Sequence, residues 1–191
     1  MNERGYLYLL IGIGIRTGWY FGFIPQEIAI FTAFFIIMGV RELRTSNREL
    51  QSAFQFAIIA LAINWSAFLG RRFVPELMIG TSLYIPLIVF EIFFDIGVFF
   101  WVLKAEYMWA PTKRSRIEWL GFTSVAAIYF LNVFMVTFSR FLQRFLPMGL
   151  LINLTNMLRP VSIVYYGVLV FIFAKLYLES RGNSPGLRRW N

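Results

Sequence analysis

Long apolar blocks separated by short polar stretches make up most of this chain. The pattern predicts six membrane-spanning helices, near residues 6–24, 26–40, 53–70, 78–103, 119–138 and 160–178. A spanning helix needs about 20 consecutive apolar residues, and most of the blocks approach that length. We therefore expect an all-α fold, a polytopic transmembrane helix bundle over 1–178 without a soluble domain, followed by a polar cytoplasmic tail over 179–191.

Two stretches leave the count and the boundaries of the spans open. The block 26–40 is short, although Pro25 suits the first turn of a helix. A five-span alternative would merge 19–40 into one helix and leave 5–15 as an interfacial helix. The region 146–178 is too long for one straight crossing, and the residue before a proline, here Arg159, disfavours the helical conformation. We therefore expect an interfacial or re-entrant helix over 148–158, with the last span beginning at Pro160.

The composition agrees with a membrane protein. Hydrophobic residues make up 59% of the 191 residues, aromatic residues make up 19%, and the mean hydropathy is +0.65. Soluble domains are usually about 45–50% apolar, so this chain has too little polar surface to cover a soluble globule.

The basic residues predict how the chain is oriented in the membrane. Twelve lie in the loops that six spans place on one side: Arg4, Arg41, Arg44, Arg48, Lys104, Lys113, Arg114, Arg116, Lys175, Arg181, Arg188 and Arg189. Four lie on the other side: Arg71, Arg72, Arg140 and Arg144. Because cytoplasmic loops carry the excess of Lys and Arg, we expect both termini in the cytoplasm of a cell with the protein in its inner or plasma membrane. The net charge of +8 then indicates contact with anionic lipid head groups rather than nucleic acid.

The chain has no cysteine and no histidine. Their absence excludes disulfides, thiolate nucleophiles, zinc sites of the usual kind, histidine-ligated haem and any triad that uses histidine. We therefore predict no metal and no cofactor.

Two carboxylates near the middle of the span 78–103 are the strongest candidates for function. Glu91 and Asp95 are four residues apart, which puts both on one face of a helix. Two carboxylates so close in a medium of low dielectric need a proton or a cation beside them. Arg16 and Arg159 are the cations within or near apolar segments, and we expect Arg16 to be the partner, with Arg159 as the second choice. The interpretations are an ion pair that locks helices together, a proton or cation relay, and a point that binds substrate.

Three glycines in the first span predict close helix packing. Gly14, Gly18 and Gly22 repeat at a spacing of four, and small residues let another backbone approach closely. The partner helix belongs either to the same chain or to a second copy. Arg16 falls on the opposite side of the helix.

Three classes of function fit these patterns. The first is a non-enzymatic membrane component that assembles with or regulates another membrane protein, because no catalytic constellation is visible. The second is a small ion- or proton-coupled transporter or channel that uses Glu91 and Asp95. The third is an intramembrane enzyme that acts on lipid-linked substrates through carboxylate and arginine chemistry.

Overall fold

The computed structural model describes residues 3–46, 50–74, 84–109 and 113–182, and in these ranges the chain is helical with short connections. The long helices are α1 (Glu3–Tyr20), α3 (Phe31–Ser46), α4 (Gln51–Phe73), α6 (Tyr84–Trp109), α7 (Lys113–Thr137) and α9 (Met148–Gly182). Two four-residue helices, α2 (Gln26–Ala29) and α8 (Ser139–Leu142), lie in connections between them. The all-α fold class is confirmed.

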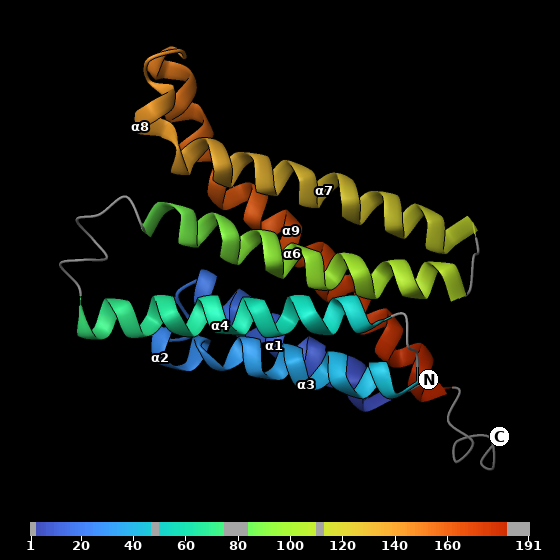
Figure 1. Cartoon of the computed structure of the whole chain (residues 1–191). Coiled ribbons are helices and arrows are strands. Elements are labelled where there is room, and N and C mark those ends of the chain that lie inside the picture. The colour runs from blue at the N-terminus through green and yellow to red at the C-terminus, as the bar shows by residue number, and fades with distance from the viewer. Residues whose placement is uncertain (1–2, 47–49, 75–83, 110–112, 183–191) are drawn as a thin grey trace.

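The long helices run back and forth along one bundle axis (Figure 1). The start of α1, the ends of α3 and α6, the starts of α4 and α7 and the end of α9 lie at one end of the bundle, whereas α2 and α8 lie at the other. Helix α1 packs against α3 and α9, α4 packs against α3 and α6, and α7 packs against α6 and α9. This alternation is what short connections between consecutive antiparallel helices produce.

The core consists of apolar side chains that meet between the helices. Its largest fully buried members include Leu9 and Ile13 of α1, Val98 of α6, Phe122 of α7 and Phe173 of α9. Every long helix also turns at least one large apolar side chain outward: Leu7, Phe34, Ile58, Phe90, Leu131 and Phe171 are examples from α1, α3, α4, α6, α7 and α9. An apolar exterior around an apolar core is expected of helices surrounded by lipid.

Within the described residues, three helices are long and apolar enough to cross a membrane: Gln51–Gly70 in α4, Arg116–Thr137 in α7 and Met148–Arg181 in α9. They support a transmembrane protein. Helix α1 carries Glu3, Arg4 and Arg16, and α3 has only 16 residues. That the chain crosses the membrane six times therefore stays a prediction.

Helix α9 differs from the expected break at Pro160. It continues from Met148 to Gly182 with Pro160 in its interior, so no separate helix over 148–158 forms. Proline removes one backbone hydrogen bond, and the remaining bonds of the helix continue on both sides of it. The helix also extends four residues into the predicted polar tail, and 183–191 lie outside the described residues.

The close approach of α1 to α3 involves glycines other than those of the predicted stripe. A Cβ on Gly39 of α3 would lie 2.8 Å from the backbone oxygen of Gly5 in α1, and one on Gly12 would lie 3.2 Å from the oxygen of Thr32. These small residues let α1 and α3 approach closely.

The stripe of Gly14, Gly18 and Gly22 is not packed against another helix. A Cβ on Gly14 or Gly22 would meet nothing within 4 Å, and one on Gly18 would meet Ile24 in the connection that follows α1. The physical reason for Gly22 is that α1 ends at Tyr20 and the chain turns there, with Gly22 at φ +79°. Glycine adopts this left-handed conformation without the penalty that a Cβ brings.

Candidate functional site: a buried charge cluster

Arg16 of α1 lies between the two carboxylates of α6. Its Nη2 donates a hydrogen bond to Oε1 of Glu91 at 2.9 Å and lies 2.7 Å from Oδ2 of Asp95. The side chain of Arg16 is 10% exposed, and those of Glu91 and Asp95 are each 15% exposed. The spacing of four residues on α6 is what aims both carboxylates at one guanidinium.

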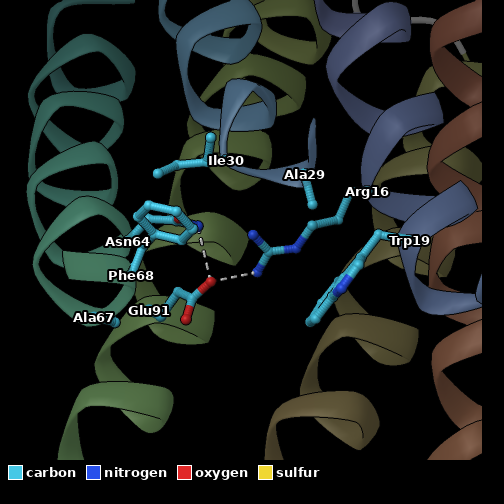
Figure 2. Close-up of a pocket in the computed structure, with 8 residues that line it drawn as sticks. All are labelled: Arg16, Trp19, Ala29, Ile30, Asn64, Ala67, Phe68 and Glu91. Atoms are coloured by element: carbon cyan, nitrogen blue, oxygen red, sulfur yellow. Dashed lines mark hydrogen bonds and ion pairs between the residues drawn. The ribbon is translucent and has the colours of Figure 1, made fainter. Parts of the chain in front are cut away.

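Asn64 of α4 is a second donor to Glu91. Its Nδ2 donates to the same Oε1 at 2.9 Å, so Asn64 and Arg16 approach this oxygen from two sides (Figure 2). Hydrogen bonds to the charged form of a carboxylate favour that form. Glu91 is therefore the better satisfied carboxylate of the two.

Three tyrosines surround the other side of the cluster. Tyr166 of α9 lines a small cavity together with Arg16 and Asp95, and its ring centroid lies 6.1 Å from that of Tyr129 of α7. The ring of Tyr129 stacks on Tyr165, with 4.6 Å between the ring centroids. Arg16 comes from α1, Asn64 from α4, the two carboxylates from α6 and the tyrosines from α7 and α9. With Thr32 of α3, every long helix contributes a polar side chain to this region.

Two small cavities adjoin the cluster. The first, about 50 Å³, is lined by Arg16, Glu91, Asn64 and Trp19 and by residues of α2 and α4 (Figure 2). The second, about 10 Å³, is lined by Asp95, Thr32 and Tyr165 among others. Each has room for about one water molecule or more, since such a site needs about 10–15 Å³.

Several buried polar atoms in this region have no hydrogen-bond partner. In the described part of the chain they include Nε of Arg16, Oγ1 of Thr32 and the hydroxyl of Tyr165. Thr32, Tyr165 and Arg16 all line the second cavity. An unpaired buried polar atom is costly, so these three atoms make this side of the cluster less stable than the side at Glu91.

The formal charges of the cluster do not cancel. One guanidinium faces two carboxylates, so the cluster carries one negative charge when all three groups are ionised. A proton on one carboxylate makes it neutral. Within the described ranges, no three or more Asp, Glu, His or Cys side chains come together in a way that holds a metal ion. The three groups form ion pairs, and either carboxylate offers a place for one proton.

The structure brings together three of the four charged residues that the sequence singles out. Arg16, Glu91 and Asp95 meet, whereas Arg159 is exposed on α9. The sequence identifies Asn64 only as a polar residue in an apolar block, of the kind that hydrogen-bonds between helices. It does not single out Thr32 or the three tyrosines. A pair of tyrosines within an apolar block, Tyr165 and Tyr166, was a signal in the sequence, because a buried hydroxyl needs a partner.

Two further polar contacts lie at the end of the bundle where α1 begins. Tyr6 of α1 donates to Glu106 of α6, and Lys175 of α9 pairs with Glu118 of α7. They join the same helices that the cluster joins, at another level of the bundle.

Comparisons of this chain with protein families, with curated proteins and with solved structures find no match.

Proposed function

We propose that the chain is a multi-pass protein of the inner or plasma membrane that crosses the bilayer six times, with both termini in the cytoplasm. Three features support this proposal. Each long helix turns large apolar side chains outward. The helices alternate in direction, so that α1 begins at the end of the bundle where α9 finishes (Figure 1). The basic residues Arg41, Lys104 and Arg116 all belong to that same end, which the positive-inside rule assigns to the cytoplasm.

Its role, in this proposal, is that of a non-enzymatic membrane component that assembles with another membrane protein or with a second copy of itself. One observation carries this choice: Arg16 is held by both Glu91 and Asp95. Charges that satisfy one another across α1 and α6 fix how the helices are arranged. The bundle then presents rigid apolar faces to a neighbour in the membrane, where packing rather than the hydrophobic effect drives association.

Photo-crosslinking in intact membranes tests this role. A photoreactive residue replaces Ile58 on α4 or Leu131 on α7, which are 46% and 61% exposed. A partner bound to one face gives a product of one discrete mass from one position and not from the other. The role would be rejected if neither these positions nor others on the outer faces gave a protein adduct.

Proton- or cation-coupled transport is the second candidate, and a specific observation favours it. The cluster has one carboxylate more than it has cations, and the cavity of about 50 Å³ beside Glu91 extends toward α2 at one end of the bundle. A carboxylate that gains and loses a proton inside a membrane is the usual element of a proton relay.

Purified protein in liposomes that contain a pH-sensitive dye separates the two candidates. Transport predicts a proton flux that Glu91→Gln and Asp95→Asn each abolish while the protein stays folded. The component role predicts no flux above that of empty liposomes. A flux that both variants leave unchanged would exclude a relay through this cluster.

A further inference from the structure

A long apolar groove lies away from the charge cluster, between α4, α6 and α7. Its volume is about 410 Å³, and its walls include Phe93, Gly97 and Trp101 of α6 and Thr123 and Ala127 of α7. The part of the groove on α6 runs over nine residues from Phe93 to Trp101, which corresponds to about 12 Å along a helix axis. The volume lies within the range of sites that hold small molecules.

The walls of the groove have almost nothing to offer a polar ligand. The remaining lining residues are apolar, and the hydroxyl of Thr123 already donates to the backbone oxygen of Leu120 at 3.0 Å in its own helix. An occupant of this groove is therefore hydrocarbon along the length of the groove, since a polar group buried there would find no partner.

The end of the groove at the α6–α7 connection is basic. On α6, Lys104 continues the stripe of Phe93, Gly97 and Trp101, and its Nζ lies 4.6 Å from the centroid of the Trp101 ring. On α7, Arg116 continues the stripe of Thr123 and Ala127, because residues three or four apart share one helix face.

Ring contacts between the two antiparallel helices place these cations at one level. Phe93 contacts Phe130, with centroids 6.0 Å apart, and Phe100 contacts Trp119, with centroids 4.6 Å apart. Lys104 lies four residues beyond Phe100, and Arg116 lies three residues before Trp119. Both are therefore about one helical turn beyond the second ring contact, at the mouth of the groove.

We propose that this groove binds one acyl chain of an anionic phospholipid, whose phosphate is held by Lys104 and Arg116. The inference goes beyond the proposed function and uses only its membrane orientation, which puts the basic end of the groove in the cytoplasmic leaflet. That leaflet carries the negative surface potential that attracts basic residues.

Native mass spectrometry of the full chain in detergent tests the proposal. The protein is mixed with phosphatidylglycerol and phosphatidylcholine that carry identical acyl chains. Wild type is expected to retain one phosphatidylglycerol in preference to phosphatidylcholine. Replacing Lys104 and Arg116 together by Gln should lower that preference about fivefold for each cation removed. Arg41→Gln, which removes an exposed cation of α3, should leave it unchanged.

A second variant tests the acyl chain itself. Ala127→Phe fills the groove and should abolish retention of both lipids. Gly121→Phe is the matched control, because a Cβ at Gly121 meets nothing within 4 Å.

Equal retention of phosphatidylglycerol by wild type and Ala127→Phe would overturn the proposal. The proposal would also be overturned if the variant with Lys104 and Arg116 replaced kept the full preference for phosphatidylglycerol. This second result does not require Ala127→Phe to fold. A lipid-free dimer of wild type that Ala127→Phe converts to monomer would show instead that a second copy occupies the groove. None of these outcomes bears on the charge cluster, which stays intact in every variant.

Discussion

Arg16 is the residue on which the buried cluster depends. A charged side chain at the centre of a bilayer costs at least about 2.5–3.5 kcal/mol on insertion scales. Arg16 as a whole is 8% exposed, and its guanidinium lies within 3 Å of the carboxylates of Glu91 and Asp95. Its removal would leave two buried carboxylates without a cation, which is worse than having no charge there.

Arg16→Leu is therefore expected to destabilise the bundle by about 3–5 kcal/mol, the usual effect of removing one partner of a buried ion pair. Combining it with Glu91→Gln and Asp95→Asn should recover part of that loss. Unfolding in mixed detergent and denaturing surfactant, followed by circular dichroism, measures both. Arg159→Leu is the control: this arginine is exposed on α9, so its loss should change stability by no more than about 0.5 kcal/mol. A combined variant that is no more stable than Arg16→Leu would contradict the ion pair.

Asn64 allows a finer test of the same cluster. Asn64→Leu removes one donor to Glu91 and should cost about 0.6–2 kcal/mol, the range found for hydrogen bonds between membrane helices. Asn64→Asp should cost more, because it places a third carboxylate beside the first two. Asn153→Leu, at an exposed position of α9, is the matched control. The thermal midpoints of the three variants in detergent rank them, and an Asn64→Asp variant as stable as wild type would show that the carboxylates are not both ionised.

The packing of α1 on α3 shows how glycine spacing and glycine contact differ at the level of the helix. Spacing at every fourth residue puts Gly14 and Gly18 on one face of α1 but does not say which way that face points. In the fold, the contact with α3 uses Gly5 and Gly12 of α1 and Gly39 of α3. Arg16 must face α6, and this requirement fixes how α1 is rotated about its own axis.

Gly39→Ala should therefore destabilise the bundle, since its Cβ would lie 2.7 Å from Cγ of Leu9 and 2.8 Å from the backbone oxygen of Gly5. Gly14→Ala should be neutral or stabilising by up to about 1 kcal/mol, because a helical glycine with open space around it gains helix propensity when replaced. If α1 and α3 pack as described, Gly39→Ala lowers the denaturation midpoint, whereas Gly14→Ala leaves it unchanged or raises it. Both variants are measured side by side with wild type. Two equal shifts would indicate that the packing differs.

The whole bundle places both of its described ends, Glu3 and Gly182, at the same end of the bundle axis, which six crossings require (Figure 1). The basic residues of the two hairpin ends, such as Arg44 and Lys104, belong to that end as well. The orientation of the whole chain in the membrane therefore depends only on which side of the membrane this basic end of the bundle faces.

A reporter fused after Asn191 is expected to read cytoplasmic, and reporters inserted near Arg48 or Lys113 should agree with it. A reporter inserted at Pro75 should read external, because the alternation of the helices leaves that connection only one side. Activity of paired reporters that work on opposite sides of the membrane measures each position. A cytoplasmic reading at Pro75 would rule out six crossings.

The sequence by itself determined the helical class, the membrane character and three members of the cluster. Apolar blocks of membrane length, and charged residues inside such blocks, can be recognised in the local sequence. Arg16, Glu91 and Asp95 could therefore be selected without a structure. The sequence ranked Arg16 before Arg159 as the partner without deciding between them, and it marked Asn64 only as a polar residue that hydrogen-bonds between helices. It did not place Thr32 or Tyr166 in the cluster. Their roles depend on which faces of different helices meet.

Only the tertiary structure decided those faces. Rotation of a helix about its axis is fixed by side-chain packing against its neighbours, and α1 illustrates it: the need to satisfy Arg16 turns Gly5 and Gly12 toward α3 and leaves Gly14 open. The same holds for Pro160, where the backbone bonds on both sides keep α9 continuous although the local preference favours a break. Local preferences are small beside the cost of an unpaired charge or backbone group in an apolar medium, and that difference explains where the fold departs from the sequence pattern.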